Sequence, residues 1–321
     1  MDKNQALIDN FLQQISWNRK PDNLYEPIAY ILSQGRKRIR PHLCLLSAEL
    51  FGVQAEEALL PAVSFEMLHN FTLIHDDIMD KADLRRGKPT VYKKWNTDIA
   101  ILSGDALYAK AFEYMLQYKG ENTLALLKLL TKTTIEICEG QQMDLDFETM
   151  QNVTIDQYLE MIRLKTAVML AACLQAGALV ASADEKSQEL IYDFGIKIGM
   201  AFQIQDDLLD VYADVNKFGK NTGGDIVENK KTFLSLKAFE LAQGDDAQEL
   251  KHYFSSVDFE KEEKFNRVKA FYDKYQIKQL AEELIDKYYQ EAFASLSQIQ
   301  VEQLKKMPLT DFVNRLINRE F

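Results

Sequence analysis

The distribution of proline restricts the fold of this chain more than any other feature of its sequence. Six prolines occur in 321 residues, and none lies between Pro89 and Pro308. A β-rich fold needs frequent turns, which proline and glycine commonly occupy, and this long stretch is also poor in glycine. Apolar residues instead recur at helical spacing nearly throughout, as at Tyr158, Met161 and Ile162. The sequence therefore predicts an all-α fold.

One domain over residues 1–321 is predicted, because no linker, low-complexity segment or change of composition marks a boundary. Helix breaks are expected near Gly52, Gly120 and Gly244, among other places, so that ten or more helices pack as a single large bundle. The segment from Gly244 to Phe321 is rich in Lys, Glu and Gln, which predicts solvated peripheral helices without chemistry.

Charge and cysteine content exclude several classes of protein. The formal net charge of −11 argues against binding to nucleic acid or to an anionic membrane. The most apolar run, Ala167 to Ala183, is interrupted by Gln175 and predicts a buried core helix rather than a membrane span. No signal sequence is recognised, and the cysteines lack metal-ligand spacing, which is typical of a reduced, cytoplasmic protein; they are Cys44, Cys138 and Cys173.

Two copies of the pattern Asp-Asp-x-x-Asp each follow an apolar helical run, at residues 76–80 and 206–210. Residues four apart lie on one face of a helix, so Asp76 projects with Asp80, and Asp206 with Asp210. Like charges at this spacing destabilise a bare helix. A cation between them removes that penalty, and Mg²⁺ suits carboxylates combined with phosphate oxygens. One copy could be merely a solvated acidic helix end, but the repetition favours metal binding.

Basic residues occur where they could complement these carboxylates. The segments concerned are Gly35 to Pro41, Arg85-Arg86-Gly87, Lys165-Thr166, and the lysines at 220 and 230. Arginine binds phosphate through two parallel hydrogen bonds, and lysine acts as a point charge. Each cation alone is a common surface feature. Together with the aspartates they predict two diphosphate-binding sites.

With these motifs, the chain resembles the trans-isoprenyl diphosphate synthases of the polyprenyl synthetase family from about Gly35 to Thr232. The matching segments are, in order, Gly35–Pro41, Asp76–Asp80, Arg85–Gly87, Gly140-Gln141 with Asp144, Lys165-Thr166, Gln203–Asp210, Gly219-Lys220, Gly223–Asp225 and Lys230–Thr232. Two positions depart from the family pattern: Arg36 and Asn229 stand where glycine is usual. Neither is a ligand position, so an altered loop rather than lost activity is expected.

The resemblance implies an isoprenoid synthase type I fold, a helical bundle around a central cavity, and a homodimer. It implies a Mg²⁺-dependent prenyltransferase that condenses isopentenyl diphosphate with an allylic diphosphate. Three magnesium ions would be bound directly by Asp76, Asp80 and Asp206. The other three motif aspartates would assist through water; they are Asp77, Asp207 and Asp210.

The resemblance also assigns the substrate-binding residues. The allylic diphosphate would be held by Arg85, Lys165, Lys220 and Lys230. The diphosphate of isopentenyl diphosphate would be held by Lys37, Arg40, His69 and Arg86. Thr166 and Gln203 would border the reacting carbons, where their oxygens stabilise a carbocation. The proton would leave to the released diphosphate, so no side-chain base is required.

Product length is expected to depend on residues that precede Asp76 on its helix. Phe71 and Thr72 lie about one turn below Asp76, and Met67 a further turn down. An aromatic residue five positions before the first aspartate resembles short-chain synthases that make C20 geranylgeranyl diphosphate. Farnesyl (C15) and medium-chain (C25–C35) products are the alternatives, and Phe71 could be core packing only.

Two other classes of protein remain possible from the sequence. A class I terpene cyclase shares the fold but needs neither the second diphosphate pocket nor a second Asp-Asp-x-x-Asp copy. A regulatory subunit of a two-component prenyl synthase is expected to lack intact aspartate motifs, whereas both are intact here. This chain could still be the catalytic half of such a pair.

Overall fold

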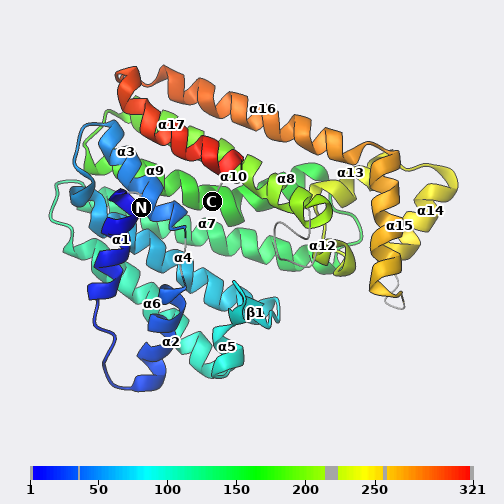
Figure 1. The fold of residues 1–321 in the computed structure, drawn as a ribbon, viewed down its shortest axis with the longest axis horizontal. Coiled ribbons are helices and arrows are strands. Elements are labelled where there is room, and N and C mark those ends of the chain that lie inside the picture. Colours follow the sequence, from blue (N-terminus) through cyan, green and yellow to red (C-terminus); the bar gives the residue numbers. More distant parts are fainter. Residues whose placement is uncertain (1–2, 35–36, 214–222, 256–258, 319–321) are drawn as a thin grey trace. The chain divides into compact units, whose positions relative to one another are not determined.

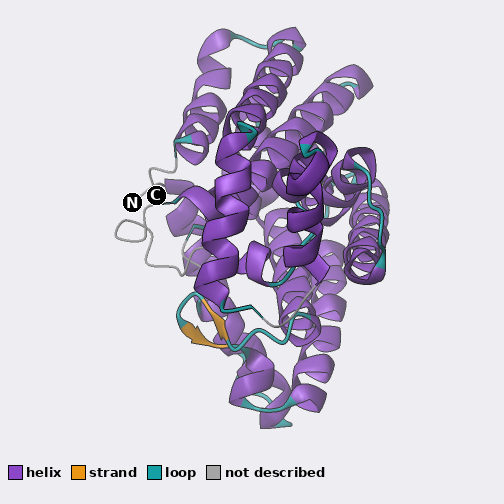
Figure 2. Ribbon diagram, turned by 90° about the vertical axis from the view of Figure 1, so that its right-hand side faces the viewer, coloured by secondary structure: helices purple, strands orange, loops and turns teal. Residues whose placement is uncertain are grey.

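The structure, a computed structural model, describes residues 3–34, 37–213, 223–255 and 259–318. Helices hold nearly all of these residues, and the only strands among them form one short hairpin (Figure 2). The predicted all-α fold is therefore confirmed. The chain divides into two compact units, each assembled from separate stretches of sequence.

The first unit comprises residues 1–134, 169–192 and 296–321. Its elements are α1 (Lys3–Gln14), α2 (Asp22–Ser33), α3 (Ile39–Leu50), η1 (Ala55–Ala58), α4 (Leu59–Met79), β1 (Leu84–Arg85), β2 (Lys88–Pro89), α5 (Val91–Lys94), α6 (Thr97–Gln117), the start of α7 (Thr123–Thr149), most of α9 (Val168–Val180), the start of α10 (Glu185–Tyr212) and α17 (Gln303–Ile317) (Figure 1).

Helix α4 is the centre of the first unit. It packs against α3 and, over much of its length, against α6. Its first half is almost entirely buried. Its second half mixes buried and partly exposed residues, and the exposed residues Met79 and Asp80 lie at its carboxyl end. A helix that is apolar all round belongs in a core, so the polar end of α4 is the part that can meet a ligand.

The second unit comprises residues 135–168 and 193–295. It contains the rest of α7 and α10, then α8 (Ile155–Ile162), η2 (Arg163–Ala167), α12 (Gly224–Val227), α13 (Phe233–Leu241), α14 (Gly244–Ser255), α15 (Lys261–Lys274) and most of α16 (Ile277–Gln298). Helix α15 contacts α12, α13 and α14, and α13 also contacts α8.

Residues 155–180 form a continuous helical stretch in which η2 is a π-helical turn. Among the described residues this is the one stretch long and apolar enough to cross a membrane, and most of it is buried within the protein. That burial agrees with the prediction of a core helix.

Candidate active site

The first aspartate motif lies at the carboxyl end of α4. Asp76 is partly exposed within the last turn, and Asp80 is an exposed residue that caps the helix, its N–H donating to the Asp76 carbonyl at 2.8 Å. Asp77 is fully buried between them. The outer two carboxylates can therefore reach a ligand in solvent, whereas the middle one points into the protein.

Arg85 is the partner of the buried Asp77. Its Nε and Nη2 both lie near Asp77 Oδ1, at 2.8 and 2.7 Å. Burial raises the pKa of Asp77, and the guanidinium of Arg85 opposes that rise. Arg85 was predicted to hold the allylic diphosphate; in the described structure its guanidinium is engaged with this carboxylate.

The two-stranded hairpin that follows α4 presents the neighbouring arginine. Its loop residues Arg86 and Gly87 both have positive φ, +54° and +74°, which matches the two-residue turn that suits the twist of a hairpin. Arg86 Nη1 donates to the Gln34 carbonyl at 3.1 Å. The hairpin thereby places Arg86 at the carboxyl end of α2. That end directly precedes the basic segment in the sequence.

His69 lies among the basic residues of the first unit. Burial lowers its pKa well below the usual range, and nearby guanidinium groups lower it further; they belong to Arg40, Arg86, Arg85 and Arg38. The imidazole is therefore neutral at physiological pH and can bind a phosphate oxygen only as a hydrogen-bond donor. The positive charge for an anion must come from its neighbours, among which Arg40 is partly exposed and Lys37 is exposed.

Arg38 has a structural role that sequence reasoning did not identify. It is buried, and its Nη1 donates to Glu66 Oε1 at 2.7 Å while Nη2 donates to the Leu32 carbonyl at 2.5 Å. Its guanidinium is thus committed to a buried carboxylate. Gly35 and Arg36 lie outside the described residues.

The predicted product-length residues form part of an aromatic cluster. Phe71 contacts His75 on its own helix and Tyr108 on α6, with ring centroids 4.7 and 5.2 Å apart, and Tyr108 in turn contacts Phe112 at 5.1 Å. Met67 is fully buried one turn below. The Thr72 hydroxyl donates to the His69 carbonyl at 2.8 Å.

The second aspartate motif lies near the carboxyl end of α10, in the second unit. Asp206 is exposed, and Asp207 is buried. Asp207 accepts from the Tyr158 hydroxyl at 2.5 Å and from Gln203 Nε2 at 3.0 Å. Gln203 Oε1 in turn accepts from the Thr166 hydroxyl at 2.9 Å. The residues predicted to border the reacting carbons thus form one hydrogen-bonded chain that ends on Asp207.

Asp225 affects the protonation of this network. Burial raises the pKa of Asp207 to about 8, and the carboxylate of Asp225 adds to the rise. Burial and Asp210 likewise raise the pKa of Asp225 to about 7. Asp210 Oδ2 accepts from the Asp225 N–H at 3.0 Å, so Asp210 anchors the start of α12. Tyr158 and Asp225 carry no assigned role in the sequence analysis.

Lys165 and Thr166 lie within the π-helical turn η2, not in a regular helix. π turns occur often at functional sites, because the extra residue re-aims neighbouring side chains. Lys165 Nζ donates to Asp144 Oδ2 at 2.5 Å. A Cβ at Gly140 would lie 2.4 Å from the Lys165 amide nitrogen, and one at Gly199 would lie 2.4 Å from Ala167 Cα. Both glycines are required by close packing around this turn.

The two remaining predicted allylic-diphosphate ligands follow the second motif. Lys230 is partly exposed, and its Nζ lies 3.8 Å from Glu228 Oε2. Lys220 and Gly219 lie outside the described residues.

The donor set suits a metal that shares its coordination with a substrate. Among the described residues, no three His, Cys, Asp or Glu side chains are arranged to hold a metal ion by themselves. Mg²⁺ typically takes only one or two carboxylates and completes its shell with water and phosphate oxygens. In the first unit the accessible carboxylates of Asp76 and Asp80 fit that requirement, and in the second unit that of Asp206 does; their all-oxygen chemistry fits magnesium.

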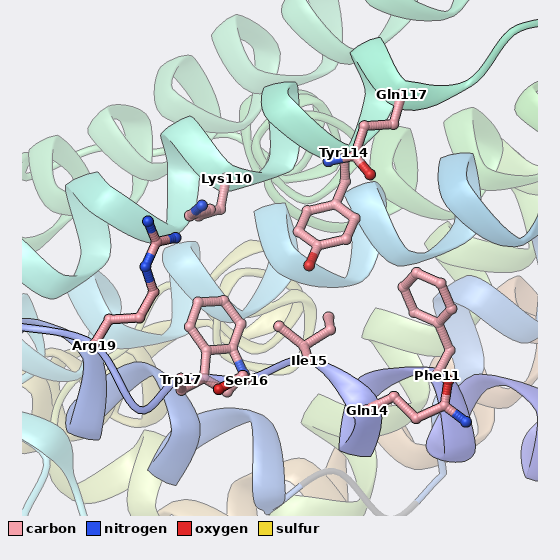
Figure 3. Close-up of a pocket in the computed structure, with 9 residues that line it drawn as sticks. All are labelled: Phe11, Gln14, Ile15, Ser16, Trp17, Arg19, Lys110, Tyr114 and Gln117. Carbon is pink, nitrogen blue, oxygen red and sulfur yellow. The ribbon is translucent and has the colours of Figure 1, made fainter.

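A cavity of about 350 Å³ lies elsewhere in the first unit, between the end of α1 with its following loop and α6 (Figure 3). Trp17, Tyr114 and Phe11 supply its aromatic lining, and Arg19 and Lys110 its cations. None of the predicted site residues lines it.

Comparison with known proteins settles the type of chemistry. The sequence profile described as Polyprenyl synthetase matches residues 21–272. This chain belongs to the polyprenyl synthetase family. It is 43% identical over 235 residues to a geranylgeranyl diphosphate synthase of Methanosarcina mazei, covering 73% of this chain and 72% of that one. It is 45% identical over 250 residues to a geranylfarnesyl diphosphate synthase of Natronomonas pharaonis, covering 72% and 73%.

Solved structures agree with this assignment. A crystal structure of a geranylgeranyl pyrophosphate synthase matches with a TM-score of 0.92 at 43% identity, covering 99% of each chain. A second, from Pyrococcus horikoshii, matches with a TM-score of 0.90 at 34% identity, covering 98% of this chain and 95% of that one. The protein is therefore a trans-prenyl diphosphate synthase with the isoprenoid synthase fold, as predicted.

Proposed function

We propose that this polyprenyl synthetase makes C20 geranylgeranyl diphosphate from isopentenyl diphosphate and an allylic diphosphate. The observation that carries the proposal is the aromatic contact of Phe71 with Tyr108, five residues before Asp76 on the helix that bears the first motif. A bulky ring held by a second ring limits the length of a chain that grows along α4. The resemblance to the Methanosarcina mazei enzyme supports the same product.

A C25 product is the second candidate. The relative from Natronomonas pharaonis is a geranylfarnesyl diphosphate synthase at a similar level of identity. Phe71 is only partly buried, so a modest turn of its side chain could admit one more five-carbon unit.

The carboxylates of Asp76, Asp80 and Asp206 are proposed to hold three magnesium ions, and Asp77, Asp207 and Asp210 to support that arrangement. When bound, the metal stabilises the negative charge that develops on the departing diphosphate. Lys165 and Lys230, with Lys220 and Arg85, hold the same group as cations. Arg85 and Lys165 exchange their present partners, Asp77 and Asp144, for phosphate oxygens or share them.

Lys37, Arg40 and Arg86 are proposed to hold isopentenyl diphosphate, with neutral His69 donating a hydrogen bond. Fixing both substrates converts a bimolecular encounter into an oriented one. The oxygens of Thr166 and Gln203, held by the hydrogen bond between them, face the allylic carbons and stabilise positive charge there. The double bond of isopentenyl diphosphate then forms the new carbon–carbon bond, and the proton leaves to the released diphosphate.

The whole chain is proposed to work as one domain, in the cytoplasm, and as a homodimer. Helix 155–180 is buried within the protein, which supports a core rather than a membrane role. Exposed apolar side chains on α6 and α7 supply a surface for a second copy; they include Leu102, Leu116 and Leu124.

Assay of the purified chain with Mg²⁺, isopentenyl diphosphate and each allylic primer, followed by sizing of the products, tests this proposal. Elongation to C20 is expected from the single purified chain. A cyclised hydrocarbon would point to a terpene cyclase, and activity only with a second protein would make this chain one half of a two-component enzyme.

Phe71→Ala tests the product-length assignment. Removing the ring opens the path below Asp76, so longer prenyl diphosphates are expected, measured by chromatography of the dephosphorylated products. Phe112→Ala, in the same aromatic cluster but without direct contact to Phe71 among the ring pairs, is the matched control. Identical product profiles for Phe71→Ala and the parent enzyme would refute the assignment.

A further inference from the structure

Lys230 extends from a backbone that is fixed on both sides. Its N–H donates to the Asp225 carbonyl at 2.9 Å, and its carbonyl accepts from the Ser235 hydroxyl at 3.0 Å. Ser235 belongs to the capping box that starts α13 together with Thr232. The position of the Lys230 ammonium therefore depends on the turn between α12 and α13.

Asn229 determines the shape of that turn. Its φ is +60°, and its N–H donates to the Ile226 carbonyl at 3.2 Å. The hydrogen bond from the Lys230 N–H to the Asp225 carbonyl spans this shorter bond. This pair of bonds is the Schellman arrangement, in which the left-handed position is usually glycine. Asparagine is among the few residues with a side chain that adopt it readily. Here the residue that replaces glycine preserves the turn and adds a polar group to it.

That polar group is bound by Lys264 of α15. Lys264 Nζ donates to Asn229 Oδ1 at 2.5 Å and to the Val227 carbonyl at 3.2 Å. The side chain is only 4% exposed, and both acceptors are neutral oxygens. A buried ammonium is costly unless its donors are used. Burial lowers the pKa of Lys264, and Lys231 adds to this. Val227 supplies one of the carbonyls that a helix end leaves without a helical partner.

The next residue of α15 contacts the other end of α12. A Cβ at Gly223, where φ is +87°, would lie 2.3 Å from Phe265 Cδ2. Consecutive residues of α15 thus contact the start and the end of α12, which spans only Gly224–Val227. Helix α15 lies in the region that the sequence analysis assigned to peripheral helices without chemistry.

We propose that Lys264 is a positioning residue for the allylic diphosphate, because its bond to Asn229 fixes the turn from which Lys230 reaches the substrate. This inference rests on the proposed role of Lys230. It also explains why this chain tolerates asparagine in place of the usual glycine: the side chain of Asn229 is the acceptor that connects the turn to α15.

Lys264→Met tests the proposal, with Lys306→Met as the matched control. Lys306 is also a buried lysine that donates to a backbone carbonyl, that of Ser297 at 3.0 Å, but it lies in the first unit. Hydrogen exchange of the peptide 224–232 is expected to accelerate about tenfold in Lys264→Met and to remain unchanged in Lys306→Met. The KM for the allylic diphosphate is expected to rise about tenfold, with the KM for isopentenyl diphosphate changed less than twofold.

Asn229→Gly is the second variant, because it keeps the turn but removes the acceptor, and glycine is favoured at its backbone angles. Its KM for the allylic diphosphate is expected to rise selectively, by about threefold. Adding Lys264→Met to Asn229→Gly should raise this KM by a smaller factor than Lys264→Met does in the parent enzyme. Equal rises of both KM values, unchanged exchange in both variants, or full additivity of the two substitutions would each overturn the proposal. Exchange needs no substrate, so an inactive parent enzyme would refute the proposed function alone.

Discussion

The two aspartate motifs share one sequence pattern, but their buried middle carboxylates are stabilised by different kinds of partner. Asp77 is paired with a cation, Arg85. Asp207 receives hydrogen bonds from two neutral groups, Tyr158 and Gln203, and lies near a third carboxylate, Asp225. In both motifs the first and last aspartates are more accessible than the middle one. The repeated pattern therefore combines two kinds of residue: outer carboxylates that stay accessible and a middle carboxylate that is buried and bound to other side chains of the protein.

Replacement of the outer aspartates should have the largest effect on activity. Asp76→Asn and Asp206→Asn each remove a proposed metal ligand, so kcat should fall on the order of 10²- to 10³-fold. Neither side chain is buried, so the free energy of unfolding in urea, followed by circular dichroism, should barely change. Retention of activity in either variant would show that the aspartate replaced is not a required metal ligand.

Replacement of the middle aspartates should lower the free energy of unfolding by different amounts in the two motifs. Asp77→Asn leaves the Arg85 guanidinium, about a quarter exposed, without its counter-charge, at a cost of about 3 kcal/mol. Asp207→Asn leaves no uncompensated charge, because both donors to Asp207 are neutral. The Tyr158 hydroxyl can turn to accept from the new amide, so a loss of only about 1 kcal/mol is expected. Equal losses, measured by urea unfolding, would show that the charge partner is not what distinguishes the motifs.

Two closely packed glycines, one against His75 beside the first motif and one against residues 164 and 165, offer a third test. A Cβ at Gly140 meets the backbone of residues 164 and 165, whereas a Cβ at Gly104 meets the imidazole of His75. Backbone within a packed helix cannot move aside, so Gly140→Ala should destabilise the protein by about 2 kcal/mol and reduce activity through Lys165. Gly104→Ala should cost less, because the imidazole can rotate. The reverse order in thermal unfolding would contradict this reasoning.

Tyr158→Phe should have the smallest effect on activity, with a loss of stability similar to that of Asp207→Asn. It removes one of the two donors to Asp207 and should lower the free energy of unfolding by about 1 kcal/mol. The allylic KM should change little, because Gln203 and Thr166 keep their hydrogen bond. A loss of activity as large as that of Asp206→Asn would mean that Tyr158 contacts the substrate.

The fold and the enzyme class were predictable because both depend largely on patterns visible in the sequence itself. Helical periodicity and each copy of the aspartate motif are visible within a few neighbouring residues, and the scarcity of proline is visible along the chain. The enzyme class followed from those motifs, and the comparisons confirm it. Product length did not follow as securely, because C20 and C25 enzymes resemble this chain about equally well.

The partners of the buried groups could not be predicted in the same way. Tyr158 lies 49 positions from Asp207, and Lys264 lies 35 positions from Asn229, so no local pattern connects them. Arg38 stands among ligand candidates in the sequence, yet it pairs with Glu66, 28 positions away. Tertiary packing decides which cation of a basic run is buried, and that packing is not encoded in the run itself.

The π-helical turn at residues 163–167 has a consequence for insertions and deletions within this enzyme. A π turn contains one residue more than the α-helical turn it replaces. Losing a single residue here would leave an uninterrupted α-helix whose flanking segments keep nearly the same orientation, because an α-helical turn completes one revolution with one residue fewer; the side chains within the turn itself would be re-aimed. Lys165 and Thr166 would then leave their hydrogen-bonding partners while the helix itself survived. The direction of these two side chains thus depends on the number of residues in this one turn as well as on residue identity.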